Sequence, residues 1–338
     1  MRGLALIFSF YGTSGTLWAL ITWLACVVVQ VAMVVAEDIQ PGTQRFLWPL
    51  LGLATVAMFT ATTRRLHHAG HTGRWAVLVL IPLAGWVAAL IIAFLPQRRA
   101  RLYAHNGARV AGYIGIALLL ALSVWRVWWT PYWIPSESMK PALLVGDYML
   151  ARAADAGDIT RGDVAVLRNP ADGSAHVKRV IALGGDTVAL QGGIVWLNGA
   201  PLPQRPIGQF REVMTRQGPN ATRPRCENGL VGEGAECRKS LFQETLPNGR
   251  SYGILNIETD GPADNFAQMQ VPQGFFFVLG DNRDNSLDSR FVTQVGGLGL
   301  VPAAQVAGVA RRVVFSAAGS SMLAFWTWRL NRYFRAVE

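Results

Sequence analysis

The sequence contains few charged residues and few cysteines for its length of 338 residues. Only 15% of the residues are Asp, Glu, Lys or Arg, whereas 51% are hydrophobic, which excludes an ordinary soluble protein. The net charge is +10, but no aromatic and basic nucleic-acid motif accompanies it. The arginines cluster beside apolar runs, where anionic lipid and membrane topology explain them better than nucleic acid does.

Three cysteines and five histidines are present. Cys26 lies inside an apolar run, where a thiol behaves as a small hydrophobic side chain. Cys226 and Cys237 lie in a loop rich in Gly, Arg and Glu, and they can form a disulfide if this loop is extracytoplasmic; two free thiols are the alternative. The histidines at 67, 68 and 71 have no acid or cysteine at a suitable spacing, so we predict neither a metal site nor a cofactor.

Hydrophobic residues are concentrated before residue 130, in runs at about 14–36, 46–61, 75–96 and 110–129. A spanning helix needs about 20 residues, so the first, third and fourth runs are long enough and the second is short. The loop Gln97–Arg109 carries four arginines and no acid, which places it in the cytoplasm and directs the fourth run outwards. An interfacial belt of aromatic residues follows that run: Trp125, Trp128, Trp129, Tyr132 and Trp133.

The arginines of the loop Thr62–Arg74 leave the number of membrane spans open. If all four runs span, this loop lies outside, against the positive-inside rule. If the third run, broken at Pro82 and Gly85, enters and returns, both arginine-rich loops stay inside. Such a re-entrant backbone must be buried among other helices. Both models place everything after the fourth run on the extracytoplasmic side.

After residue 133, short β-branched runs separated by Gly, Pro and Asp predict a mainly-β domain of coiled, barrel-like sheets. The fold class is therefore an N-terminal α-helical transmembrane domain followed by a mainly-β soluble domain. We predict four parts: a multi-helix membrane module (1–109), an anchor helix with its interface (110–133), a β-rich domain (134–316) with an irregular insertion (203–270), and a C-terminal interfacial segment (317–338). A solvent-facing terminal helix is the alternative for the last part.

The first segment with candidate chemistry is Ile134-Pro-Ser-Glu-Ser-Met-Lys-Pro141. The two prolines stiffen it, and residues two apart in extended chain face the same way. Ser136 and Ser138 can therefore point into one site. Taken alone, the pattern is typical of a loop that follows a membrane helix.

The second segment is Ala175–Asp186, which contains Lys178 within a predicted strand. Lys178 shares a face of this strand with Val180 and Ala182. Burial on an apolar face lowers the pKa of a lysine, which a lysine general base requires. A lysine whose ammonium reaches solvent at a strand end is the alternative.

The third segment is Gly280–Arg290, whose Asp, Asn, Ser and Gly residues predict a tight turn held by side-chain hydrogen bonds to the backbone. Asp288 and Arg290 are spaced to form an ion pair. The segment lacks the Gly and the terminal Glu of an EF-hand loop, so we do not expect a calcium site.

Four ordered patterns, PSxSMxPxLxxGD, RGDVxVLRxP, VKRVxALxGD and GDNRDNSxDSR, follow the apolar region. Over about residues 125–315 the chain resembles the bacterial type I signal peptidases. It departs from them at Gly184, where many members have proline, and in its larger N-terminal module. That module, over roughly residues 8–96, resembles a family of bacterial inner-membrane proteins of unknown function marked by FSFxG and RRLHDxGxSGWW, with His68 in place of the Asp.

The resemblance implies a Ser–Lys dyad in which Ser138 is the nucleophile and Lys178 is the general base. It implies that the Ser136 hydroxyl, together with the Ser138 backbone N–H, donates hydrogen bonds to the oxyanion. It also implies that Ser286 hydrogen-bonds and orients the lysine. The supporting residues that it implies are Asp288, Arg290, Asp281 and Arg179.

The resemblance also implies that the substrate is the cleavage region of a secretory preprotein. An extended peptide can add as a strand beside the backbones of Ile134–Ser136 and His176–Val177. No acid is placed to orient His176, so we assign it no catalytic role. The predicted substrate-binding residues are Ile134, Pro135, Leu143, His176 and Val177.

We therefore predict a membrane-bound serine endopeptidase of the bacterial inner membrane, multi-pass, with its catalytic domain on the periplasmic side. Its expected partners are preproteins, membrane lipids and the nearby secretion channel. The alternative is a non-enzymatic membrane regulator or scaffold with a peptidase-like binding domain. A self-cleaving repressor is disfavoured by the membrane helices, and a penicillin-binding enzyme needs a lysine three residues after its serine.

Overall fold

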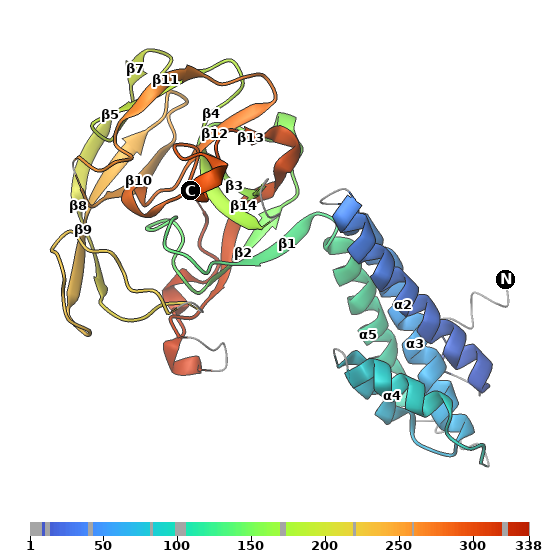
Figure 1. Ribbon diagram of the computed structural model, residues 1–338. Helices are drawn as coiled ribbons and strands as arrows, with labels where there is room; N and C mark the ends of the chain where they lie inside the picture. Colours follow the sequence, from blue (N-terminus) through green and yellow to red (C-terminus); the bar gives the residue numbers. More distant parts are fainter. Residues whose placement is uncertain are drawn as a thin grey trace. The chain divides into compact units, whose positions relative to one another are not determined.

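The computed structural model describes residues 9–10, 14–39, 43–81, 84–98, 106–169, 174–218, 221–258, 260–319 and 324–337. The chain divides into two compact units, Met1–Trp128 and Trp129–Glu338. Figure 1 draws the first as a group of helices and the second as coiled sheets. Pro82, at the predicted break of the third apolar run, and Arg99 and Arg101 of the arginine-rich loop lie outside the described residues.

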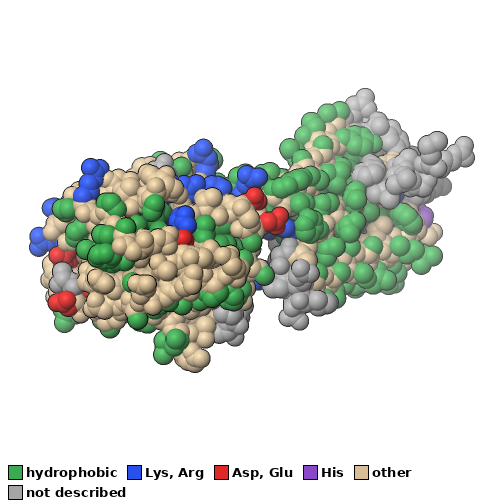
Figure 2. Space-filling view, turned by 90° about the horizontal axis from the view of Figure 1, so that it is seen from above, with side chains coloured by type: hydrophobic (Ala, Val, Ile, Leu, Met, Phe, Trp, Pro, Cys, Tyr) green, Lys and Arg blue, Asp and Glu red, His purple; other side chains and the backbone are tan. Residues whose placement is uncertain are grey.

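The first unit consists of apolar helices. By length and composition, the helical stretches Thr16–Ala36 and Thr43–His68 are long enough to cross a membrane, and Ala84–Ala93 and Val110–Trp125 are shorter apolar helices. Large apolar side chains spaced along one face of the first stretch are exposed: Leu17, Ile21, Leu24, Val28, Val31 and Val35. Figure 2 shows hydrophobic side chains over much of the visible surface of the helical unit. The α-helices are α2 (Thr16–Ile39), α3 (Trp48–His68), α4 (Ala84–Ala93) and α5 (Asn106–Trp125).

The structure lengthens the second apolar run, which we predicted to be short, and interrupts the third. The second lies in the helical stretch Thr43–His68, where the hydroxyls of Thr60, Thr62 and Thr63 donate to carbonyls four residues earlier, so these polar side chains have partners inside the helix. The third forms the 3-10 segment Gly73–Leu80 and then the separate helix α4, so it is interrupted as in the second topology model, and the number of spans stays a prediction. A Cβ at Gly85 would lie 2.4 Å from the Val79 carbonyl oxygen, so glycine permits the close approach of the start of α4 to the 3-10 segment.

The second unit is mainly β, which confirms the predicted fold class. Within the described residues, three antiparallel sheets form. The largest has the order β1 (Trp129–Trp133), β2 (Asp147–Arg152), β14 (Val306–Ser316), β3 (Val164–Arg168), β4 (Ala175–Ala182), β12 (Phe275–Leu279) and β13 (Val301–Pro302). The second has the order β11 (Phe266–Gln270), β5 (Thr187–Gln191), β6 (Ile194–Leu197) and β7 (Ala200–Pro201).

Strand β3 is covered by apolar side chains on both faces, unlike a strand of a sheet that has one face in solvent. Val164 and Val166 enter one apolar core, and Ala165 and Leu167 enter another on the opposite face. All four residues are buried, as expected for a strand covered on both sides. The sheet therefore holds β3 and its neighbour β4 rigidly at the centre of the unit.

The segment 203–270, which we predicted to be irregular, contains the third sheet. Its order is β10 (Ser251–Asn256), β9 (Glu236–Thr245) and β8 (Gln204–Val213). Strands β8 and β9 pair from Gln204 opposite Glu244 to Val213 opposite Glu236. The side chains of β8 are mostly exposed, so the segment lacks the apolar alternation that reveals a half-buried strand.

The predicted anchor 110–133 crosses the boundary between the two units. Helix α5 ends at Trp125, and residues 129–133 form β1 of the second unit. At the other end of this unit, the described residues 324–337 form short 3-10 turns and isolated β-bridges at Trp328 and Ala336, so the terminal helix considered as an alternative is not present there. Arg332 fixes this segment through its ion pair with the buried Asp147, at 2.5 Å.

Candidate active site

The serine loop, which we define as Pro135–Leu143, connects β1 to β2. Ile134 is hydrogen-bonded at both backbone groups, donating to the Asp147 carbonyl and accepting from the Gly146 N–H, each at 2.9 Å. Within the loop, the N–H of Leu143 donates to the Met139 carbonyl at 2.9 Å. The side chains of Ile134, Met139 and Leu143 are buried in one apolar core. These apolar anchors fix the loop on both sides of its serines.

The structure brings the two predicted serines together. The hydroxyl oxygens of Ser136 and Ser138 are 3.3 Å apart, in accordance with the same-side geometry expected for residues two apart. Ser136 is exposed, whereas only 9% of Ser138 is exposed. The loop therefore presents one buried and one accessible hydroxyl at the same place.

Lys178 reaches the same place from β4. Its Nζ donates a hydrogen bond to the Ser138 hydroxyl oxygen at 2.9 Å, and only 3% of the residue is exposed. Burial lowers the pKa of Lys178 to about 8; the Asp288 carboxylate opposes this shift and the Arg290 guanidinium adds to it. About a tenth of the amine is therefore neutral at pH 7, and this fraction can accept a proton.

The Gly280–Arg290 turn packs directly on the serine loop. The Asn282 N–H donates to the Ser138 carbonyl oxygen at 3.0 Å. A Cβ at Gly280 would lie 2.6 Å from that same oxygen and 2.3 Å from the Ser286 hydroxyl oxygen. Only glycine permits this approach, so the turn sets the position of the Ser138 backbone.

The predicted pair of Asp288 and Arg290 is formed within this turn. Arg290 Nε and Nη2 each donate to the Asp288 carboxylate at 2.8 Å, and the Gly280 N–H donates to it at 3.0 Å. Burial would raise the pKa of Asp288, but the charge and hydrogen bonds of Arg290 outweigh burial and lower it. Asp288 is therefore a buried carboxylate anion whose charge also acts on Lys178.

Arg179 and Asp281, for which the sequence indicated no defined role, form a buried bidentate ion pair. Arg179 Nε and Nη2 each donate to the Asp281 carboxylate at 2.7 Å. The guanidinium also lies over the Tyr252 ring, 3.9 Å from its centroid. Because Arg179 is adjacent to Lys178 on β4, this pair ties the strand of the lysine to the turn that holds Ser138.

Ser286 differs from its predicted role. Its hydroxyl is buried and has no hydrogen-bond partner within the described residues, so the expected bond to Lys178 is not formed. The amine of Lys178 instead makes its bond to Ser138. A buried hydroxyl without a partner is unfavourable, and it leaves a donor and acceptor free beside the dyad.

The predicted substrate-binding residues divide into two groups. Ile134 and Leu143 are buried, and Val177 packs against the same apolar core. Pro135 is exposed, and His176 is half-buried and bonds through Nε2 to the Ser174 hydroxyl at 2.9 Å. Because both backbone groups of Ile134 already bond to the start of β2, the prediction that they also bind a peptide strand needs correction.

The two predicted cysteines are joined by a disulfide between the loop after β8 and strand β9. The Cα atoms of Cys226 and Cys237 are 5.2 Å apart. Cys26 is a free, buried thiol in the first unit. Neither the disulfide nor Cys26 contributes a group to the Ser138–Lys178 site.

The structure adds buried charges that the sequence analysis did not single out. Glu137 and Lys140 of the serine loop form an ion pair at 2.8 Å, and Lys140 also reaches Glu212 of β8 at 2.5 Å. The spacing of three residues between Glu137 and Lys140 was a possible signal. The partner on β8 is 72 residues away, and no local pattern identifies it.

Comparison with known proteins supports a signal peptidase. The family model described as signal peptidase, peptidase S26, matches residues 108–315, and a model for proteins of unknown function (DUF805) matches residues 12–102. Signal peptidase I of Rickettsia typhi is 29% identical over 232 residues, covering 60% of this chain and 76% of that protein. Signal peptidase I of Rickettsia prowazekii is 28% identical over 234 residues, covering 61% and 79%.

A crystal structure of a signal peptidase I from Enterococcus faecalis V583 is 26% identical, covers 45% of this chain and 95% of that chain, and has a TM-score of 0.24. The family assignment does not depend on it. The segment matched by the peptidase model makes up more than half of the chain and includes the serine loop, β4 and the Gly280–Arg290 turn. The chain therefore belongs to the signal peptidase family, peptidase S26, and is a serine peptidase.

Proposed function

We propose that the protein is a membrane-bound serine endopeptidase that removes N-terminal signal peptides from secretory preproteins, with Ser138 as the nucleophile and Lys178 as the general base. The observation that carries this proposal is the hydrogen bond of 2.9 Å between the buried Lys178 amine and the Ser138 hydroxyl. A lysine with a lowered pKa can activate a serine without a histidine and an aspartate.

The mechanism follows from these positions. Neutral Lys178 accepts the proton of Ser138 as the hydroxyl oxygen attacks the scissile carbonyl carbon. The oxyanion of the tetrahedral intermediate then accepts hydrogen bonds from the Ser138 N–H and the Ser136 hydroxyl. The Lys178 ammonium returns the proton to the leaving amine, and an acyl-enzyme on Ser138 remains. Water, deprotonated by Lys178, hydrolyses this acyl-enzyme.

The substrate peptide is proposed to lie along the first half of β4. Strand β12 pairs with β4 only at residues 179–182, so within the described residues no strand is paired with this edge at 175–178. An extended peptide can add there by backbone hydrogen bonds. Val177, which is half-buried on this part of β4, packs against the core that contains the buried Ile134 and Leu143, and this apolar surrounding suits small side chains near the cut.

The helices of the first unit are proposed to anchor the enzyme as a multi-pass protein of the bacterial inner membrane. The exposed apolar face of α2 is unfavourable in water and suits contact with lipid. The disulfide between Cys226 and Cys237 is consistent with a periplasmic peptidase unit, since such bonds persist in oxidising compartments. This placement brings the site near preproteins that emerge from the secretion channel.

The test is cleavage of a purified preprotein by the full-length chain in lipid vesicles. We expect Ser138→Ala and Lys178→Ala to abolish cleavage at the signal-peptide junction. Thr222→Ala, which removes an exposed hydroxyl outside the site, is the matched control and retains the wild-type rate. Normal cleavage by either dyad variant would overturn the assignment.

A further inference from the structure

A buried carboxylate lies between the two serines of the serine loop. Glu137 Oε1 accepts a hydrogen bond from Lys140 Nζ at 2.8 Å, and its Oε2 accepts one from Asn285 Nδ2 at 3.1 Å. The backbone oxygen of Glu137 accepts from the Lys140 N–H at 3.0 Å and from Asn282 Nδ2 at 3.2 Å. Both the side chain and the backbone of the residue between Ser136 and Ser138 are therefore held in place.

The β8–β9 hairpin supplies the other half of this cluster. Lys140 Nζ also donates to Glu212 Oε2 of β8 at 2.5 Å. Lys239 Nζ of β9 donates to Glu212 Oε1 at 2.7 Å and lies 3.6 Å from Glu137 Oε2. We call Glu137, Lys140, Glu212 and Lys239 the loop–hairpin cluster. Its two carboxylates and two ammonium groups alternate in space, and its formal charge is zero.

The cluster is buried, so each charge depends on the others. Lys140 is 1% exposed and Lys239 is fully buried. Burial would raise the pKa of Glu212, but the charges of Lys140 and Lys239 outweigh burial and lower it. Glu212 is the most exposed member, with 12% of its side chain accessible, and removing any one member leaves a largely buried charge uncompensated, which favours a shift of the neighbouring groups.

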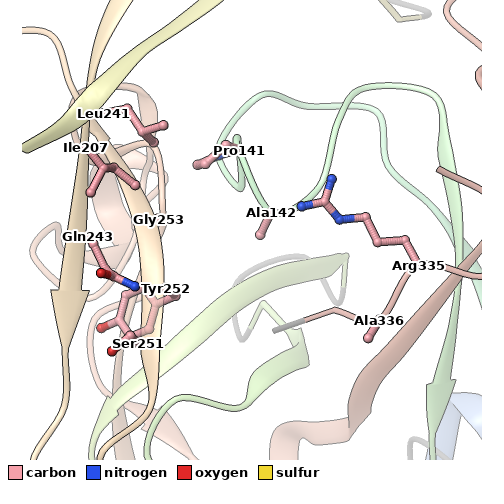
Figure 3. A pocket seen from close by; sticks show the side chains of 10 residues that line it. All are labelled: Pro141, Ala142, Ile207, Leu241, Gln243, Ser251, Tyr252, Gly253, Arg335 and Ala336. Carbon is pink, nitrogen blue, oxygen red and sulfur yellow. The ribbon is translucent and has the colours of Figure 1, made fainter. Parts of the chain in front are cut away.

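Apolar packing between the hairpin and the serine loop is incomplete on one side. Figure 3 shows a pocket of about 410 Å³ with Pro141 and Ala142 on one side and Ile207, Leu241 and Gln243 on the other. At the other end of the loop, the segment after β8 comes close, since a Cβ at Gly218 would lie 2.9 Å from the Pro135 carbonyl oxygen. The loop–hairpin cluster lies on Glu137 and Lys140, between these two ends.

We propose that the four residues of the loop–hairpin cluster are positioning residues, through which the β8–β9 hairpin sets the positions of the Ser136 and Ser138 hydroxyls. This inference rests on the proposed Ser138–Lys178 mechanism. Glu137 is bonded covalently to both serines, so a shift of its backbone, which is held at the carbonyl by the Lys140 N–H and Asn282 Nδ2, moves both hydroxyls relative to Lys178. The disulfide supports the same arrangement, because Cys237 lies directly opposite Glu212 in the hairpin.

The experiment measures kcat and KM of the full-length enzyme in vesicles with a preprotein substrate, normalised to folded protein by circular dichroism. Glu212→Gln keeps the shape of the side chain but leaves two ammonium groups with one carboxylate. We expect kcat to fall by about 10- to 100-fold, as for an ångström-scale misplacement of reacting groups, with KM within about twofold. The double variant Glu212→Gln with Lys239→Met restores neutrality and regains most of kcat.

The matched control is the exposed pair of Arg211 and Glu236 on the same hairpin, 3.7 Å apart. Replacing both by Gln leaves kcat and KM unchanged. If Glu212→Gln fails to fold, Glu212→Asp keeps the charge but withdraws the carboxylate from Lys140, and the same fall in kcat is expected.

If Glu212→Gln or Glu212→Asp keeps the wild-type kcat and only its melting temperature falls, the inference is overturned. A cluster that only stabilises the fold would behave in that way. Failure of the double variant to regain kcat would also contradict it. If the wild-type enzyme does not cleave, or Lys178→Ala cleaves normally, the proposed function fails as well. The two failures are therefore distinguishable.

Discussion

Lys178 and Ser138 are 40 residues apart in the chain, and the amine of the first donates a hydrogen bond to the hydroxyl of the second at 2.9 Å. The two residues belong to a strand and a loop that are distant from each other in the sequence. Lys178 is carried by β4, which pairs with β3 at 175–179 and with β12 at 179–182, and Ser138 by a loop anchored in an apolar core. The chemistry of the proposed site depends on how firmly each is held.

The pH dependence of cleavage should follow the titration of Lys178. The base is active when neutral, and its pKa is lowered to about 8 by burial, so kcat/KM rises with pH through an apparent pKa near 8. At pH 7 about a tenth of the enzyme then carries the neutral amine. The measurement is kcat/KM from pH 6 to 9.5. A profile with an inflection near 6.5 that His176→Ala removes would instead assign the base to His176.

Replacing Lys178 by Met should stabilise the fold at neutral pH while abolishing activity. The pKa of Lys178 is lower in the folded than in the unfolded chain, so the unfolded chain binds the extra proton between about pH 8 and 10.5. Wild-type stability therefore rises with pH across this window. Below pH 8, we expect the free energy of unfolding of Lys178→Met to exceed that of the wild type by about 1–3 kcal/mol. This difference shrinks as the pH rises to 10.5. Denaturant unfolding at pH 7 and 10 measures it; a constant difference would contradict the prediction.

Ser136→Ala should lower kcat by about 10²- to 10³-fold with little change in KM, because a lost oxyanion donor acts mainly on the transition state. Ser136 is exposed and its hydroxyl lies 3.3 Å from the Ser138 hydroxyl, so we expect the melting temperature to change little. Steady-state kinetics and a thermal melt on one preparation measure both. An equal fall in activity from Thr222→Ala would show that the loss is not specific to the site.

Gly280→Ala should inactivate the enzyme by displacing the serine loop. The new Cβ would clash with the Ser286 hydroxyl oxygen at 2.3 Å and with the Ser138 carbonyl oxygen at 2.6 Å. Adding Ser286→Gly relieves only the first clash, so the double variant should remain inactive. Cleavage assays on the single and double variants test this. Full recovery in the double variant would show that the Ser138 backbone accommodates the added carbon.

Arg179→Met should destabilise the peptidase unit by about 3–5 kcal/mol, because it leaves the buried Asp281 carboxylate without its partner. The variant Arg179→Met with Asp281→Asn removes both charges and should recover more than half of that loss. Chemical denaturation of the two variants compares them. Replacing the exposed pair of Arg223 and Glu233 by Gln is the control, and it should change stability by less than about 1 kcal/mol.

The sequence was most informative where a local pattern reports a local environment. Alternating β-branched runs identified the mainly-β unit, because strand side chains alternate between faces with a period of two. The stiff Ser136–Ser138 segment and the apolar face of Lys178 were also visible in the residues themselves. The sequence was misleading where polar residues form regular structure, as in the threonine-rich end of α3 and the exposed strand β8.

The sequence by itself determined that this chain combines apolar helices with a β-rich unit that carries serine, lysine and an Asp/Asn turn. Only the tertiary structure decided which groups meet. It joined Lys178 to Ser138, left the Ser286 hydroxyl without a partner within the described residues, and placed Glu212 and Lys239 beneath the serine loop. The physical reason is that the buried face of a helix or strand is visible in the pattern of residues that are close together in the sequence. An ion pair between residues 72 or 102 positions apart depends instead on how strands and loops close around a shared core.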